Sequence, residues 1–252
     1  MAFYDLSKQK RTELAETISN DIVKELKGSQ LKKLHAYFSD EDSYIRKTAY
    51  LSLGRIYFTG KELQSKIIKI LDKLLKENDP KVRQTVINAA GEIGKKDFEI
   101  VQHIFDKGLF DEHHSPRNAV IGSIKKIGEV NPKPVLQWAK KYLHYPDKEI
   151  RREICHGIEL RGRKYPQDIL PLLKELENDT TARVRNTLVH VLGQIAYKKG
   201  CLPTVVEHLK KWKNKQLVDD ALEEIIDVHE RYKNFSALTQ AEAQEYISKH
   251  FP

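Results

Sequence analysis

The stretch that decides the fold is Asp147-Lys148-Glu149-Ile150-Arg151-Arg152-Glu153-Ile154-Cys155-His156-Gly157-Ile158-Glu159-Leu160-Arg161-Gly162-Arg163-Lys164. It opens on an aspartate, a residue type that caps helix N-termini, and continues as an amphipathic helix. Its opening pattern is an acidic residue, two spacers, a β-branched residue and an arginine, and copies of this pattern, two of them degraded, recur along the chain. The recurring arginines are Arg46, Arg83, Arg117, Arg151 and Arg185, with spacings of 37, 34, 34 and 34 residues. A fixed period of this size is typical of a solenoid, in which each unit stacks on the next.

The repeats predict an all-α fold, a right-handed α-solenoid of about six helix pairs. We expect residues 1–252 to form a single solenoid, with an N-terminal cap helix in residues 1–28, repeats over residues 30–213 and a C-terminal cap over residues 214–252. The residues expected to cap the repeated helices are Asp42, Asp79, Ser115, Asp147 and either Asp179 or Thr180. No segment alternates over enough residues to demand a β-strand.

Two stripes are expected on each repeated helix, counted from its arginine. Positions +3, +4, +7 and usually +10 carry small or apolar residues, which predicts a buried stripe. Positions +1, +5 and +9 carry mostly polar residues, which would merge across stacked helices into one concave surface. Solvated helix faces favour Lys and Glu, whereas this stripe is rich in Asn, Gln, His and Arg, so we interpret it as a binding surface. The binding residues expected on it are Lys47, Gln84, Asn88, Asn118, Lys126, Arg152, Asn186 and His190.

The charge of the chain favours a polyanionic partner. The formal net charge is +8 and the isoelectric point is about 9.2. Residues 140–164 carry a local excess of basic residues, whereas the C-terminal cap is acidic near Asp219 and Glu223. An excess of positive charge on a proposed binding surface is typical of proteins that bind nucleic acid. A lysine-rich soluble protein without such a partner is the alternative reading of the composition.

The two cysteines, Cys155 and Cys201, form no disulfide framework and no zinc-binding pattern. We expect Cys155 to be a small core residue and the compartment to be reducing. Met1 to Lys10 lacks the apolar stretch of a signal peptide, and no run of residues approaches the length of a membrane span. The sequence therefore predicts a cytoplasmic monomer with no membrane partner, no metal and no cofactor.

The repeats resemble HEAT repeats over about residues 30–213. A narrower resemblance covers Arg151-Arg152, Cys155 to Ile158, Arg161, Ile169 to Leu173 and Asp179 to Asn186. This stretch is similar to the bacterial DNA alkylation-repair glycosylases built from HEAT repeats, the AlkC/AlkD-like group. The resemblance implies a duplex DNA partner on the concave face and release of alkylated purines. This sequence departs from that family at His156, where a catalytic glutamate before the glycine is expected.

Glycosidic cleavage of a cationic base needs a carboxylate near the sugar to stabilise its developing positive charge. The candidates in register are Glu92 and Glu159, with His156 between them, and we predict Glu159 and His156 as the catalytic pair. A structural alternative is an ion pair of Glu159 with Arg163, or of Glu92 with a neighbouring lysine. The side chains predicted to contact phosphates beside the polar stripe are Arg161, Arg163 and Lys164.

Two further expectations concern the repeat geometry. His156 and His190 occupy the same repeat position and should adjoin on neighbouring helices. The repeated arginines should form a structural ladder with acidic residues of adjacent repeats rather than contact DNA. The leading hypothesis is a DNA-binding HEAT-repeat protein of the alkylation-repair type, with an active glycosylase and a non-catalytic binder both open. The alternative is a protein-binding scaffold or assembly factor.

Overall fold

The computed structural model describes residues 3–251. All regular structure in these residues is helical, with no β-strand among them, which confirms the predicted all-α class. The chain divides into two compact units, Met1–Asn131 and Pro132–Pro252. A single solenoid over the whole chain stays a prediction, and its outer limits at residues 1 and 252 lie outside the described residues.

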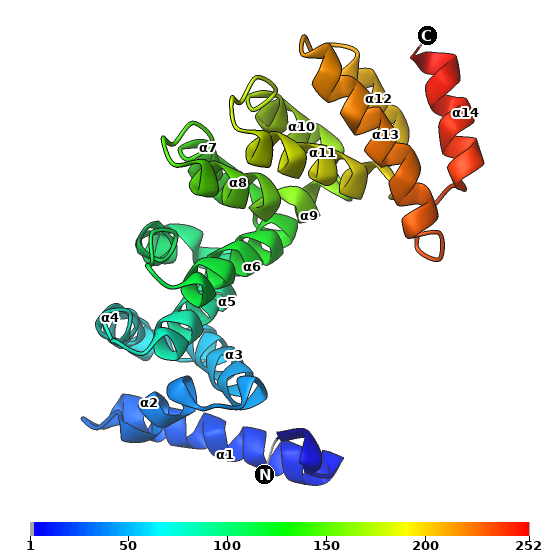
Figure 1. The fold of residues 1–252 in the computed structure, drawn as a ribbon. Helices are drawn as coiled ribbons and strands as arrows, with labels where there is room; N and C mark the ends of the chain where they lie inside the picture. The colour runs from blue at the N-terminus through cyan, green and yellow to red at the C-terminus, as the bar shows by residue number, and fades with distance from the viewer. Residues whose placement is uncertain (1–2, 252) are drawn as a thin grey trace. The chain divides into compact units, whose positions relative to one another are not determined.

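The first unit is built from stacked helices around one row of repeated helices (Figure 1). The repeated helices are α3, the first part of α5, and α6; α3 packs on α5 and α5 packs on α6. The helix α5 changes direction at Asp97, whose backbone angles are non-helical (φ −118°, ψ 60°). The elements of this unit are η1 Phe3–Asp5, α1 Lys8–Lys27, α2 Lys32–Ser39, α3 Ser43–Thr59, η2 Lys61–Leu63, α4 Gln64–Leu74, α5 Pro80–Gly108 and α6 His114–Val130.

The second unit repeats this plan (Figure 1). Its repeated helices α8, α11 and α13 lie in one row, since α8 packs on α11 and α11 packs on α13, while α10 packs on α12. The last helix, α14, packs on α13 and α12. The elements are α7 Pro132–Lys140, α8 Lys148–Gly157, α9 Glu159–Gly162, α10 Pro166–Lys174, α11 Ala182–Ala196, α12 Cys201–Leu209, α13 Lys215–Arg231 and α14 Gln240–His250.

Three of the predicted N-caps are confirmed. The carboxylates of Asp42, Asp79 and Asp147 each accept a hydrogen bond from the N–H two residues on. The other two predictions were wrong. His113, rather than Ser115, caps α6, because its Nδ1 accepts from the Ser115 N–H at 3.1 Å.

The N-cap of α11 is Thr181, rather than Asp179 or Thr180. The Asp179 carboxylate accepts instead from the Thr181 N–H at 2.8 Å, so it fixes the turn before the helix. Sequence alone identified the acidic residue and missed which position begins the helix, because several polar residues in a row can all satisfy first-turn N–H groups.

The helix expected over residues 147–164 is interrupted. The helix α8 ends at Gly157, Ile158 forms a turn, and the short helix α9 follows from Glu159. His156 and Glu159 therefore lie on different helices, although their side chains are close in space.

The predicted buried stripe is confirmed at the core of each repeat. Its members Leu53, Ile87, Ile124, Ile154 and Leu192 are at most 1% exposed. Cys155 is also fully buried, and this burial raises the pKa of its thiol, as expected for a small core residue.

The predicted arginine ladder is confirmed at Arg83 and Arg151. The Nη1 group of Arg83 donates to the carbonyl oxygens of Glu77 and Asn78, and its Nε and Nη2 donate to both oxygens of Asp111 at 2.7 and 2.9 Å. Arg151 makes the equivalent bonds to two preceding carbonyls and to Asp179. Each of these two arginines therefore ties its own helix start to the turn that begins the next repeat.

Candidate functional site

A groove of about 490 Å³ lies on the second unit where α8 packs on α11. The groove is lined by polar side chains alone: Arg152, His156, Arg183, Asn186, Thr187 and His190. Four of these residues occupy positions +1 and +5 of two successive repeats. Positions +1 and +5 of the predicted polar stripe therefore share one groove in this unit.

The two groove arginines share one carboxylate. Arg152 donates from Nε to Glu149 Oε2 at 2.9 Å, and Arg183 Nη1 lies 2.9 Å from Glu149 Oε1. Arg152 also lies 3.6 Å from Glu153. The Arg183 side chain stays 64% exposed, so its guanidinium keeps donor groups that face solvent. The Glu149 bridge holds the two guanidinium groups near one another.

The two histidines adjoin, as predicted, with ring centroids 6.1 Å apart. His156 Nδ1 lies 2.8 Å from Glu159 Oε2, and His190 Nδ1 lies 3.6 Å from Glu224 Oε1. A carboxylate at Nδ1 orients an imidazole ring and favours the Nδ1–H tautomer. Glu159 is therefore close enough to orient the His156 ring, whereas Glu224 lies beyond hydrogen-bond distance of His190.

Glu159 lies beneath this groove rather than on the exposed polar stripe where the sequence analysis put it. Its side chain is 1% exposed and pairs with both His156 and Arg163. Glu159 stands at position +8, where three other repeats have glycine (Gly54, Gly91 and Gly193). Position +8 faces the adjacent helix in this packing, which explains the burial. The predicted structural pair of Glu159 with Arg163 is confirmed.

Arg163 extends this buried network. Its Nη2 also donates to Gln194 Oε1 at 2.8 Å, and Gln194 is only 4% exposed. Gln194 occupies position +9 and was expected on the polar surface, so that expectation was wrong. The network fixes Glu159 and, through it, His156.

The other predicted phosphate contacts of this unit do not line the groove. Arg161 pairs with Asp168 at 2.7 Å, and its guanidinium lies 3.8 Å from the centre of the Tyr165 ring. Lys164 is exposed. Contacts of Arg161, Arg163 and Lys164 with phosphate stay predictions, although the guanidinium groups of both arginines are engaged in ion pairs within the chain.

The predicted binding residues of the first unit lie on its row of repeated helices. Lys47, Asn118 and Lys126 are exposed, and Gln84 and Asn88 are partly exposed. They come from α3, α5 and α6, which pack in sequence. The predicted candidate Glu92 pairs with Lys95 at 2.5 Å, the structural alternative expected for it.

Sequence reasoning missed two groove residues, Arg183 and Thr187. They stand at positions −2 and +2 of their repeat, outside the two stripes that were counted. The helical spacing of Arg183, Asn186 and His190 was a usable signal, because residues three and four apart share one helix face.

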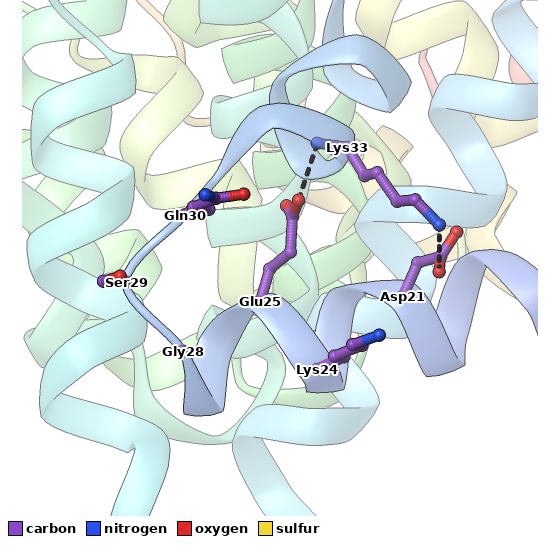
Figure 2. A pocket seen from close by; sticks show the side chains of 7 residues that line it. All are labelled: Asp21, Lys24, Glu25, Gly28, Ser29, Gln30 and Lys33. Carbon is purple, nitrogen blue, oxygen red and sulfur yellow. Dashed lines mark hydrogen bonds and ion pairs between the residues drawn. The ribbon is translucent and has the colours of Figure 1, made fainter.

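A second hollow lies between α1 and α2 and is lined by Asp21, Lys24, Glu25, Gly28, Ser29, Gln30 and Lys33 (Figure 2). Its polar groups largely satisfy one another. The Glu25 carboxylate accepts from the N–H groups of Lys33 and Leu34, both at 2.8 Å, and so caps the start of α2. Lys33 also pairs with Asp21 at 2.6 Å. This arrangement joins the two helices and offers little to a ligand.

Within the described part of the chain, no cluster of three or more His, Cys, Asp and Glu side chains has the arrangement of a metal site. None of the helices in residues 3–251 combines the length and apolarity that a membrane span needs.

Comparisons with known proteins place this geometry among helical-repeat folds. The model of the family described as non-SMC mitotic condensation complex subunit 1 matches residues 11–130, fewer than half of the 252 residues. A comparison with curated proteins found no match.

Several solved structures are similar to the chain. AlkD2 from Streptococcus mutans is 17% identical, with 88% of this chain and 100% of that chain covered and a TM-score of 0.52. A chain of the Pds5–Scc1 complex is 16% identical, with 87% of this chain and 38% of that chain covered and a TM-score of 0.52. The protein smu.31 from Streptococcus mutans UA159 is 18% identical, with coverages of 83% and 96% and a TM-score of 0.47. At these identities, the likeness to AlkD2 and to the Pds5–Scc1 chain establishes the fold alone, a solenoid of HEAT-like helix pairs.

Proposed function

We propose that this protein binds duplex DNA through the groove between α8 and α11. The observation that carries the proposal is the set of side chains that line that groove, because Arg152, Arg183, Asn186, Thr187 and both histidines can all donate hydrogen bonds. Phosphate oxygens accept from these side-chain types in protein–DNA interfaces. The resemblance of residues 151–186 to alkylation-repair glycosylases supports duplex DNA as the choice among polyanions.

Contacts of this kind position a duplex without reading its sequence. The groove residues offer guanidinium, imidazole, amide and hydroxyl groups, all of which suit phosphate. The proposal therefore predicts binding of similar strength to duplexes of unrelated sequence.

The test is fluorescence anisotropy of a labelled 20-base-pair duplex titrated with the full chain. Replacing Arg152 and Arg183 with Ala should weaken binding at least tenfold, because two phosphate contacts are lost and Glu149 is left without its two cationic partners. The matched control is Lys141→Ala with Lys211→Ala, which removes two exposed positive charges of the same unit outside the groove. Equal losses of duplex affinity in the two double variants would indicate general charge attraction and would contradict binding in the groove.

A catalytic role for Glu159 and His156 stays a prediction. The buried position of Glu159, held by His156 and Arg163, favours a role in orienting His156 over contact with a sugar. Release of 7-methylguanine from methylated duplex DNA is the assay. Release that is abolished in Glu159→Gln would support catalysis, whereas duplex binding without release by the unaltered protein would mark a non-catalytic binder.

A further inference from the structure

The first unit has a groove of different chemistry, of about 370 Å³, on α3 and α5. Its floor is apolar and comes from Leu51, Gly54 and Phe58 of α3. The groove lies along the C-terminal halves of its helices, at positions +5 to +13, whereas the DNA groove of the second unit lies at positions −2 to +5. The two grooves are therefore formed by different positions of the repeated helices.

The floor owes its shape to the close approach of two helices. A Cβ atom placed on Gly54 would lie 2.6 Å from the Glu92 Cβ, so only glycine fits there. The absence of a side chain at this position lets α5 pack closely on α3, with Glu92 beside the apolar floor.

The rim of this groove is cationic. Arg55 is exposed, and its guanidinium is held over α3 by hydrogen bonds to the Leu51 carbonyl and the Ser52 hydroxyl. The ammonium of Lys96 lies 4.9 Å from the centre of the Phe58 ring. Glu92 is the one carboxylate in the lining, and its pairing with Lys95 at 2.5 Å compensates its charge. Two positive charges, those of Arg55 and Lys96, therefore remain beside an apolar floor.

We propose that this groove binds an acidic peptide segment that carries a leucine or aromatic side chain. The apolar floor would bury that side chain, and the cationic rim would pair with flanking Asp or Glu residues. A nucleic-acid backbone fits this groove less well, because its floor gives phosphate oxygens no donors and would remove water from them without replacement. The proposal is independent of DNA binding by the second unit.

The experiment begins with selection of random 12-residue peptides displayed on phage against the full chain. We expect enriched sequences to combine at least two acidic residues with a leucine or aromatic residue. One enriched peptide, synthesised with a fluorescein label, is then titrated with the protein by anisotropy. Charge reversal by Arg55→Glu with Lys96→Glu should weaken its binding at least tenfold, and Leu51→Ala should weaken it several-fold.

The control is Lys73→Glu with Lys76→Glu, the same change of charge at exposed lysines of the first unit outside the groove, which should alter affinity less than twofold. Far-ultraviolet circular dichroism checks that all variants remain folded. Failure of any peptide to enrich, enrichment of basic peptides, or equal binding by the groove and control variants would overturn the proposal. Loss of duplex binding in the groove variant, with peptide binding retained, would instead indicate that this surface binds DNA.

Discussion

Arginines at the same position of successive repeats differ in the partners that they bind. Arg83 binds two carbonyl oxygens and the Asp111 carboxylate, and the side chains of both residues are about nine-tenths buried. Arg46 makes the same two carbonyl contacts, to Asp40 and Glu41, and no ion pair is seen for it among the described residues. The carboxylate contact is thus the part of the ladder that differs between repeats.

The ladder predicts unequal losses of stability. Arg83→Ala should lower the free energy of unfolding by about 3 kcal/mol, because it leaves the Asp111 charge buried without its partner. Arg46→Ala should cost about 1 kcal/mol, the usual contribution of such hydrogen bonds. Urea unfolding followed by circular dichroism measures both, and equal costs would contradict the structural role of the carboxylate.

The carboxylates of Asp111 and Asp179 predict that the folded protein loses stability in acid. Burial alone would raise the pKa of Asp111, but hydrogen bonds from Arg83 and the His113 N–H outweigh it, so the pKa is lowered. The pKa of Asp179 is lowered in the same way, with Arg151 and the Thr181 N–H opposing burial. A lowered folded-state pKa gives stability that is present above the unfolded value of about 3.9 and is lost as pH falls through the folded value.

We therefore expect the unfolding free energy to fall more steeply below about pH 4 in the natural protein than in Asp111→Asn with Asp179→Asn. Urea midpoints measured at intervals from pH 6 to pH 2.5 provide the comparison. Parallel pH profiles for the two proteins would show that these aspartates do not couple protonation to folding.

At the scale of helices, the periodicity of the sequence predicted where the repeated helices lie and which of their faces is buried. The spacing of the arginines located the repeated helices α3, α5, α6, α8 and α11, and the apolar spacing located the buried stripe, which follows from 3.6 residues per turn. Periodicity could not show that the helix over residues 147–164 breaks at Ile158, or that Glu159 and Gln194 turn inward. Those outcomes depend on how the neighbouring helices pack around these residues.

The sequence also predicted only some of the residues of the candidate site. Arg152, His156, Asn186 and His190 were predicted on one surface, and they line one groove. Arg183 and Thr187 join them from the first turns of α11, whose orientation against α8 is a property of packing. The pattern of residues along one helix does not show which residues of the adjacent helix will lie beside it.

Close helix packing at position +8 gives a prediction of its own. A Cβ atom on Gly91 would lie 2.5 Å from the Ser123 Oγ and 2.8 Å from its Cβ, so Gly91→Ala should destabilise the first unit by about 1–3 kcal/mol. Gly122 on α6 has nothing within 4 Å of such an atom, so Gly122→Ala should stabilise the helix by about 0.5–1 kcal/mol. Thermal unfolding of both variants tests the contrast, which fails if both shift in the same direction.

At the scale of the whole molecule, the two grooves proposed as binding sites, one in each unit, differ in chemistry. The groove of the second unit is lined by arginine, histidine, asparagine and threonine, whereas the groove of the first unit has an apolar floor and a cationic rim. Repetition of one structural unit therefore does not impose one groove lining. The net charge of +8 favours polyanionic partners in general, and we expect the lining residues to determine which surface a given partner contacts.

The salt dependence of duplex binding tests the central claim most directly. Each phosphate neutralised by a basic side chain contributes about 0.9 to the slope of log affinity against log salt concentration, because counterions are released on binding. Anisotropy titrations between 50 and 200 mM KCl should therefore give a slope shallower by roughly two for Arg152→Ala with Arg183→Ala than for the natural protein. A slope left unchanged by that double substitution, with duplex affinity also unchanged, would contradict binding of the DNA backbone in the α8–α11 groove.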